Sequence, residues 1–166
     1  MPHFEPSEQW LINCLRDAYL VARFSDDKST KVGAIIYSYY GDELTTGCNK
    51  LLVNLPSDAP REEKYMFVAH AEESAISRAA REGKKLSGAI MVCPWAACHD
   101  CAKAIVQAGI YDVYAHGDAI DKTPERWEKS YEAARIMFRE NGVNYTNVYG
   151  KIGGCENLFD GEVWYP

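Results

Sequence analysis

The spacing of apolar residues predicts an amphipathic helix near the start of the chain, from about Ser7 to Arg23. Within this range the apolar residues recur with the period of one helix face, at Leu11, Cys14, Leu15, Ala18 and Val21. Two β-rich runs follow, at 32–37 and 43–48, and Gly41-Asp42 separates them. The pattern therefore predicts a helix followed by a β-hairpin.

Helical and β-rich patterns then alternate along the chain. Helical spacing begins near His70, near Cys98 and at Pro124, and each of these patterns ends before a glycine, at Gly83, Gly109 and Gly142. Between them lie three short apolar runs typical of strands, at 89–93, 111–115 and 143–149. Such alternation predicts an α/β fold, a three-layer α/β/α sandwich around a mixed sheet of about five strands.

Two segments do not fit this alternation. Residues 51–69 contain Pro56, Pro60 and a cluster of charges, so this segment either walls a pocket or is a solvated loop. The tail, 150–166, is rich in glycine and aromatic residues, and we expect it to pack on the domain or on a neighbouring subunit. The pattern assigns no chemistry to the tail.

Composition narrows the class of protein. The chain has 166 residues, 47% of them hydrophobic and 25% charged, which predicts one globular domain spanning residues 1–166. It contains no apolar run of membrane-spanning length and no signal-peptide pattern, so we expect a cytoplasmic protein without a membrane partner. Its six cysteines are then expected to be metal ligands and free thiols rather than a disulfide framework.

The charge balance points to a small substrate. A formal net charge of −6 disfavours an extended nucleic-acid surface, because phosphate backbones bind basic faces. A local basic pocket for one phosphate is still compatible with that balance, since net charge describes the whole surface. Basic candidates for such a pocket lie near the first strand, at Lys28, Lys31 and Lys50, although a plain solvated loop is the simpler explanation for any single one of residues 28–31.

The chemistry concentrates in two motifs, His70-Ala71-Glu72 and Cys98-His99-Asp100-Cys101. Together they offer three zinc ligands, His70, Cys98 and Cys101, and a carboxylate that need not bind the metal. A structural zinc site is normally closed by four protein ligands, whereas a catalytic site has three and leaves one position for water or substrate. The spacing therefore predicts a catalytic zinc site.

His-x-Glu combined with Cys-x-x-Cys is the signature of zinc-dependent nucleobase deaminases. Further motifs occur in the same order as in one branch of these enzymes, at Lys31–Ile36, Thr46–Asn49, His70–Glu72 and Cys98–Ile110. On these motifs the chain resembles the deoxycytidylate (dCMP) deaminase family of the cytidine deaminase superfamily, over roughly residues 8 to 148. The resemblance implies the cytidine deaminase-like fold, one Zn²⁺ per subunit and a homo-oligomer, a dimer or a hexamer.

The resemblance also implies the reaction and two further site residues. The reaction is the hydrolytic deamination of a cytosine nucleotide, dCMP to dUMP with release of ammonia. Glu72 corresponds to the proton-transferring glutamate, and Asn49 corresponds to the asparagine that contacts the substrate. The substrate partner is then a small nucleotide and not a nucleic acid.

The chain departs from the family pattern at a few positions. Ala97 stands where the family usually has proline, Ser74 stands where it has asparagine, and Lys50 replaces the last glycine of a Gly-Tyr-Asn-Gly motif found in allosterically regulated members. Residues 50–69 contain no Cys or His for a second, structural zinc. Regulation by nucleoside triphosphates is therefore left open.

Several alternatives remain at this stage. A deaminase of cytidine, free cytosine or C5-modified dCMP would share every catalytic residue, and so would a nucleic-acid deaminase, although the acidic balance disfavours the latter. A non-enzymatic zinc-binding module would need a fourth ligand, for which His99 is the obvious candidate, but adjacent helix positions diverge by about 100°. Glu73 is the alternative acid to Glu72. Trp95 either stacks on a base or covers the core.

Overall fold

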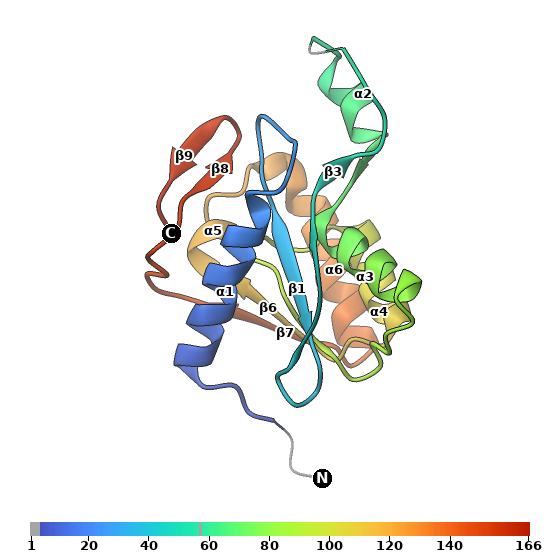
Figure 1. The fold of residues 1–166 in the computed structure, drawn as a ribbon, viewed down its shortest axis with the longest axis vertical. Helices are drawn as coiled ribbons and strands as arrows, with labels where there is room; N and C mark the ends of the chain where they lie inside the picture. The colour runs from blue at the N-terminus through green and yellow to red at the C-terminus, as the bar shows by residue number, and fades with distance from the viewer. Residues whose placement is uncertain (1–3, 57) are drawn as a thin grey trace.

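The computed structural model describes residues 4–56 and 58–166 of the chain, and its helices and strands alternate along most of that length (Figure 1). The helices are α1 (Glu8–Ala22), α2 (Arg61–Tyr65), α3 (Ala71–Arg81), α4 (His99–Ala108), α5 (Gly117–Ile120) and α6 (Glu128–Glu140), with a 3-10 turn, η1 (Glu125–Trp127), before α6. The strands are β1 (Gly33–Tyr37), β2 (Glu43–Cys48), β3 (Lys50–Leu51), β4 (Val68–Ala69), β5 (Ile90–Val92), β6 (Asp112–His116), β7 (Asn144–Val148), β8 (Asn157–Phe159) and β9 (Glu162–Trp164).

Five strands form a central mixed sheet in the order β2-β1-β5-β6-β7. The hairpin β1–β2 and the pair β1–β5 are antiparallel, whereas β5–β6 and β6–β7 are parallel. The parallel pairs are joined through helices that cross over the sheet, as parallel strands require. The predicted sheet of about five strands and the predicted hairpin are both confirmed.

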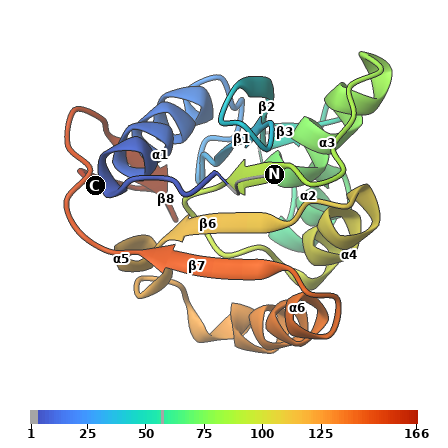
Figure 2. The ribbon, with the colours of Figure 1, turned by 90° about the horizontal axis from the view of Figure 1, so that it is seen from below.

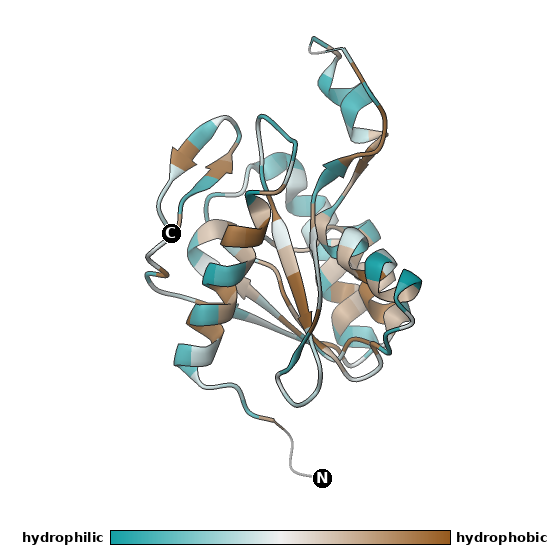
Figure 3. Ribbon diagram, viewed as in Figure 1, coloured by the Kyte–Doolittle hydropathy of each residue, from teal (hydrophilic) through white to brown (hydrophobic). Residues whose placement is uncertain are grey.

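Helices cover both faces of the sheet, which gives three layers (Figures 1 and 2). Strand β1 is buried along its whole length, so its alternating side chains reach two separate cores. Ile35 and Tyr37 pack with α1 on one face, and Ala34 and Ile36 pack with α3 and α4 on the other. Figure 3 shows that α1 alternates between hydrophobic and hydrophilic residues, as a helix lying on a sheet should.

Local signals in the sequence fix most helix ends. The Ser7 side chain accepts a hydrogen bond from the Trp10 backbone N–H and caps α1. Gly109, with φ of 74°, ends α4 in the left-handed conformation that glycine adopts most easily. The helix predicted from Pro124 differs at its start, because the first turn forms the tighter 3-10 helix η1 and α6 begins at Glu128.

A glycine in β2 lets α3 lie directly against the sheet. A Cβ atom at Gly47 would lie 2.3 Å from the Ala75 backbone nitrogen and 2.5 Å from the Ala71 carbonyl oxygen. No side chain fits at that separation, and the neighbouring atoms are backbone atoms that cannot rotate away. Gly47 therefore sets how close the start of α3 comes to the sheet.

Two segments outside the predicted alternation contain helices and strands that were not predicted. The first is an arm of residues 50–56 and 58–69, in which the two-stranded ladder β3–β4 carries α2 away from the rest of the fold (Figure 1). Figure 3 shows that α2 is mostly hydrophilic, and none of its residues is buried. The second is the C-terminal hairpin β8–β9, which turns at Asp160 and Gly161 with φ of 49° and 82°. Among residues 4–56 and 58–166, no helix is long and apolar enough to cross a membrane.

Candidate active site

His70, Cys98 and Cys101 come together at the N-termini of two helices. His70 is the N-cap residue of α3, and Cys98 is the N-cap residue of α4. The His70 Nδ1 atom lies 3.3 Å from the Cys98 Sγ atom and 3.4 Å from the Cys101 Sγ atom. Within the part of the chain that the structure describes, no other group of three or more His, Cys, Asp or Glu side chains has the spacing of a metal site.

The cluster has the dimensions of a zinc site. Tetrahedral zinc has bonds of about 2.3 Å to sulfur and about 2.0–2.1 Å to nitrogen, which separates a ligating nitrogen and sulfur by about 3.5 Å. The two observed separations of 3.3 and 3.4 Å are close to that value. Three donors leave one tetrahedral position open, as in catalytic zinc sites.

The protein environment favours the ligating form of Cys98. Hydrogen bonds with the Cys101 thiol and the His70 ring outweigh the effect of burial and lower the pKa of Cys98 to about 4. The Cys101 backbone N–H also points at this sulfur, 3.5 Å away, at the positive end of α4. A thiolate is the form of cysteine that binds metal, so the helix start prepares the site for a cation.

Glu72 and Glu73 have different surroundings, although they are neighbours in the chain. Glu72 is 5% exposed and faces the cavity beside the cluster, where burial raises the pKa of its carboxyl to about 7. The Glu73 carboxylate instead accepts a hydrogen bond from the His70 backbone N–H, 3.3 Å away, and so caps α3. The structure thus gives Glu73 a structural contact and leaves Glu72 facing the cavity.

His99 lies outside the cluster, as its helix position predicts. Its Nδ1 atom is 2.8 Å from the Ser130 hydroxyl on α6, and its side chain is 47% exposed. The same hydroxyl accepts a hydrogen bond from the His99 backbone N–H at 3.0 Å. The contact therefore fastens the start of α4 to α6 and does not add a fourth metal ligand.

Comparison with known proteins identifies the family. Residues 8–117 match the family model described as the cytidine and deoxycytidylate deaminase zinc-binding region. The chain belongs to this deaminase family. As a member it is a zinc-dependent hydrolase, and among its described residues His70, Cys98 and Cys101 form a cluster typical of one zinc per subunit.

Individual relatives agree with this assignment. A deoxycytidylate deaminase of Mus musculus is 31% identical over 158 residues, which cover 87% of this chain and 84% of that protein. A deaminase of Aliivibrio fischeri that is named as uncharacterized is 33% identical over 141 residues, which cover 83% of this chain and 92% of that protein. The crystal structure of a dCMP deaminase from the cyanophage S-TIM5, in complex with dCMP and dUMP, superposes with a TM-score of 0.65 at 26% identity, covering 87% of this chain and 99% of that chain.

The zinc site of this deaminase opens into a cavity of about 420 Å³ with aromatic walls. Trp127 and Tyr131 stack on one another near His70, with an interplanar angle of 13°. Trp95 and Phe159 form a second stack, with ring centroids 3.9 Å apart. Trp95 is thus a buried core residue, one of the two interpretations that the sequence left open, and it also lines the cavity.

The exposed end of the cavity, here called the mouth, is positively charged. Its charged residues are partly or fully exposed and comprise four cations and two anions, Lys28, Arg61, Lys64, Arg126, Asp27 and Asp160. Arg126 donates hydrogen bonds to Asp160 and holds the pKa of that carboxyl below its ordinary value. The mouth therefore carries an excess of two positive charges on a protein whose net charge is −6.

The sequence analysis predicted only some of the charged residues that line the mouth. Lys28, Ser29 and Thr30 line the cavity, but Lys31 does not, because its Nζ atom donates a hydrogen bond to the Ser25 carbonyl oxygen. Lys50 is exposed on β3 and is not among the lining residues. Residues of the 51–69 segment do line the cavity, so this arm is a wall of the pocket rather than a free loop.

Asn49 is buried at the edge of the cavity, where it holds a loop. Its Oδ1 atom accepts a hydrogen bond from the Val32 backbone N–H at 2.8 Å, and its Nδ2 atom donates to the Thr30 carbonyl oxygen at 2.8 Å. Each of these atoms has capacity for one more hydrogen bond, since an amide nitrogen has two hydrogens and an amide oxygen has two lone pairs.

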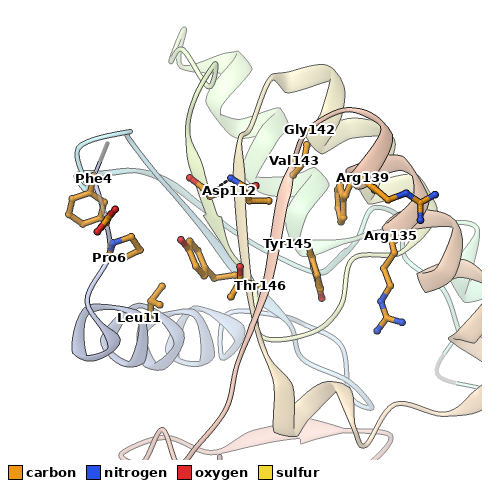
Figure 4. Close-up of a pocket in the computed structure, with 14 residues that line it drawn as sticks. Phe4, Pro6, Leu11, Asp112, Arg135, Arg139, Gly142, Val143, Tyr145 and Thr146 are labelled. Atoms are coloured by element: carbon orange, nitrogen blue, oxygen red, sulfur yellow. Dashed lines mark hydrogen bonds between the residues drawn. The ribbon is translucent and has the colours of Figure 1, made fainter. Parts of the chain in front are cut away.

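A larger cavity, of about 910 Å³, lies at the β7 edge of the sheet (Figure 4). Figure 4 shows Phe4 and Leu11 on one side of this edge strand and Arg135 and Arg139 of α6 on the other, pointing away from it. The lining side chains are thus spread over both faces of the strand, and none belongs to the metal cluster. Of these two cavities, the smaller is lined by His70 and Cys98 of the metal cluster and is therefore the candidate active site.

Among the residues of the active-site cavity that the sequence analysis did not identify are Arg126, Phe159 and Asp160. Arg126 looked like one more charge in a helical pattern. For the other two a signal existed, because Asp160-Gly161 is the dipeptide typical of a two-residue hairpin turn, and alternating residues flank it. That signal predicts the hairpin, but it does not reveal that the hairpin lies against the active site.

Proposed function

We propose that this deaminase hydrolyses dCMP to dUMP and ammonia. The observation that carries the proposal is the polarity of one cavity, which has the zinc ligands and Glu72 at its buried end and an excess of cations at its exposed end. A nucleoside monophosphate has the same polarity, with an uncharged base at one end and a phosphate at the other. The relatives named as dCMP deaminases support the same substrate.

Glu72 is the proton carrier in the proposed reaction. Zinc at the His70, Cys98 and Cys101 site supplies a water that is activated for attack near neutral pH. Glu72 accepts a proton from the attacking water and transfers one to N3 of the cytosine ring as the oxygen bonds to C4. It then takes the proton of the new C4 hydroxyl and delivers it to the amine, the bond between C4 and nitrogen breaks, and ammonia leaves as the C4 carbonyl of uracil forms.

The remaining residues hold the nucleotide. The two stacked pairs that line the cavity offer flat apolar surfaces to a planar base, and aromatic rings prefer offset or edge-on packing. Asn49 contacts the nucleotide through the hydrogen-bonding capacity that its loop contacts leave free. The two excess positive charges of the mouth are close in size and opposite in sign to the charge of a phosphate monoester, which is about −1.5 to −2 at neutral pH.

A substrate panel tests this proposal. We expect kcat/KM for dCMP to exceed that for deoxycytidine by about 10-fold or more, because charge-assisted hydrogen bonds to phosphate are about twice as strong as neutral ones. The panel includes CMP, cytidine, cytosine, 5-methyl-dCMP and an RNA anticodon loop containing adenosine, and we expect no product from the RNA at physiological salt. Equal efficiency on dCMP and deoxycytidine would instead indicate a nucleoside deaminase.

We also propose that the enzyme is a homo-oligomer. The arm exposes large apolar side chains close together in the chain, with exposed fractions between 36% and 73%, namely Leu52, Val53, Tyr65, Met66 and Phe67. Exposed apolar clusters of this kind usually mark a protein contact. Sedimentation velocity of the purified protein tests the proposal, and a monomer at all concentrations would contradict it.

A further inference from the structure

The turn of the C-terminal hairpin lies at the mouth of the active-site cavity and carries a carboxylate. Asp160 accepts hydrogen bonds from Arg126 Nη2 at 2.8 and 3.0 Å and lies 3.3 Å from Arg61 Nη2. Arg126 comes from η1 and Arg61 comes from the arm, so one side chain joins three segments that are far apart in the chain. Both Arg126 and Asp160 lie beyond residue 117, where the family match ends.

Backbone hydrogen bonds fasten the hairpin to the cavity-lining loop of residues 28–30, here called the substrate loop, and to Lys31 next to it. The Lys31 N–H donates to the Leu158 carbonyl at 2.9 Å, and the Gly161 N–H donates to the Ser29 carbonyl at 2.8 Å. The Asp160 N–H also donates to the Thr30 hydroxyl. These contacts hold the turn at a set position relative to the cavity, so the Asp160 carboxylate has little freedom to lie elsewhere.

The backbone of Asp160 is unusual as well. Of the described residues other than glycine, Asp160 alone has a φ in the left-handed region, at 49°. Aspartate tolerates this conformation better than most residues, and the first position of a two-residue turn requires it. Glycine and asparagine would satisfy the turn at least as well, so turn geometry alone does not require the carboxylate.

The carboxylate leaves donors on both arginines available. Asp160 uses the Nη2 atom of each guanidinium, and Tyr65 uses Nε and Nη2 of Arg61. Among the contacts of the described residues, Arg126 Nε and Nη1 and Arg61 Nη1 have no acceptor. A guanidinium held at Nη2 by a carboxylate presents its remaining donors to a second anion in a defined orientation.

We propose that Asp160 is a positioning residue that sets the specificity of the enzyme for phosphorylated substrate by orienting Arg126 and Arg61 at the mouth. The inference rests on the proposed function, because it takes the 5′-phosphate as the second anion. It adds that the C-terminal hairpin is part of the substrate site, although the family match does not include it.

The sign of one mutational effect tests this inference. Asp160→Asn keeps the side-chain shape and suits the turn, but it removes the negative charge. If Asp160 orients the arginines, KM for dCMP rises by about five-fold, the scale expected for two exposed ion pairs, and kcat does not change. If Asp160 only repels the phosphate, KM for dCMP falls, because the mouth gains positive charge.

Two further variants separate positioning from folding and from general charge. Asp160→Gly removes the carboxylate while favouring the turn, so it should raise KM for dCMP as Asp160→Asn does. Glu162→Gln removes one negative charge from the same hairpin at an exposed position outside the cavity lining, and it should leave KM for dCMP within two-fold of wild type, roughly the effect of a screened surface charge.

A binding measurement distinguishes this inference from the proposed function. Calorimetric titration with dUMP and with deoxyuridine gives the affinity gained from the phosphate, first in the wild-type protein and then in Asp160→Asn. A gain in wild type that shrinks about five-fold in Asp160→Asn supports the inference. A gain that is unchanged or larger in the variant overturns the inference alone, whereas no gain in wild type overturns the proposed dCMP specificity.

Discussion

The Nδ1 atom of His70 lies 3.3 Å from the Sγ atom of Cys98, although 28 positions separate the two residues in the chain. Each occupies the N-cap position of its helix, so the starts of α3 and α4 point at the same place. The first backbone N–H groups of each helix have no partner within the helix, and one of them, from Cys101, points at the Cys98 sulfur, so the helix starts give the site a positive field that stabilises thiolate. The site therefore depends on where two helices begin as much as on its ligands.

Removing one thiolate should empty the zinc site. Losing a residue that only hydrogen-bonds to a metal ligand typically lowers metal affinity by about 10–100-fold. Cys101→Ala removes a ligand itself, so we expect a larger loss of zinc affinity. Zinc content of the purified protein, measured by atomic emission after dialysis, checks this. Cys155→Ala is the matched control, since Cys155 is a partly exposed free thiol outside the cluster. Full zinc occupancy in Cys101→Ala would overturn the assignment of this ligand.

Glu72→Gln should retain zinc and the fold but lose about 10²–10⁴-fold in kcat, because a general acid–base contributes on that scale. Steady-state kinetics with dCMP, together with zinc analysis, provide the measurement. Glu73→Ala is the control and should lose about 1 kcal/mol of stability from its helix cap while turnover stays within a few-fold of wild type. If Glu72→Gln keeps its turnover of dCMP and Glu73→Ala loses it, Glu73 is the acid.

Gly47→Ala should damage the zinc site from a distance. The added methyl group would meet the backbone of α3, so the helix that begins after His70 must move. We expect a loss of about 1–3 kcal/mol in the free energy of unfolding, with lower zinc occupancy and activity. Gly83→Ala costs a similar amount, about 1–2 kcal/mol, because φ is 66°, but its Cβ meets no atom within 4 Å. If both variants keep full zinc occupancy, the close approach at Gly47 does not position the site.

The pH dependence of stability should report on Asp27, which lies under the substrate loop. Burial opposes its ionisation, but hydrogen bonds from Lys64 and from the Ser29 and Thr30 backbone N–H groups outweigh burial and lower the pKa of the carboxyl. A lowered folded-state pKa stabilises the fold above the unfolded value of about 3.9, and this stabilisation is lost as pH falls through the folded value.

Urea unfolding of wild type and Asp27→Asn between pH 2.5 and 7 (roughly the range over which a carboxyl titrates) gives this contribution as a difference. Asp27→Asn should be the less stable protein at pH 7, and the difference should shrink as pH falls below about 4. A difference that stays constant across the range would show that ionised Asp27 adds nothing to folding.

Much of the fold was predictable because its signals are local. The hydrophobic period located α1, and glycines in the left-handed conformation, such as Gly109, follow the helices where the sequence suggested. The zinc ligands were predictable for the same reason, since Cys98 and Cys101 share one helix turn and His70 lies two residues before a glutamate. Even Glu73, which looked like a rival acid, has a helix-capping contact that sequence rules describe.

The mouth of the cavity could not be predicted in this way. Arg126 and Asp160 are 34 positions apart, and Arg61 and Asp160 are 99 positions apart, so nothing local links them. Lys31 shows the opposite error. It lies next to the substrate loop in the sequence, but its amine donates a hydrogen bond to the Ser25 carbonyl oxygen and does not line the cavity. Which charges face a pocket is decided by tertiary packing, which single-sequence patterns do not encode.

The most direct test of the account is a product balance for dCMP with protein in three states: zinc-loaded, stripped by a chelator, and reloaded with zinc. The account predicts equal amounts of dUMP and ammonia from the loaded protein, almost none from the stripped protein, and recovery on reloading. Undiminished turnover without zinc would contradict it, and so would a fully zinc-loaded, folded protein that releases no ammonia from dCMP or any other cytosine compound.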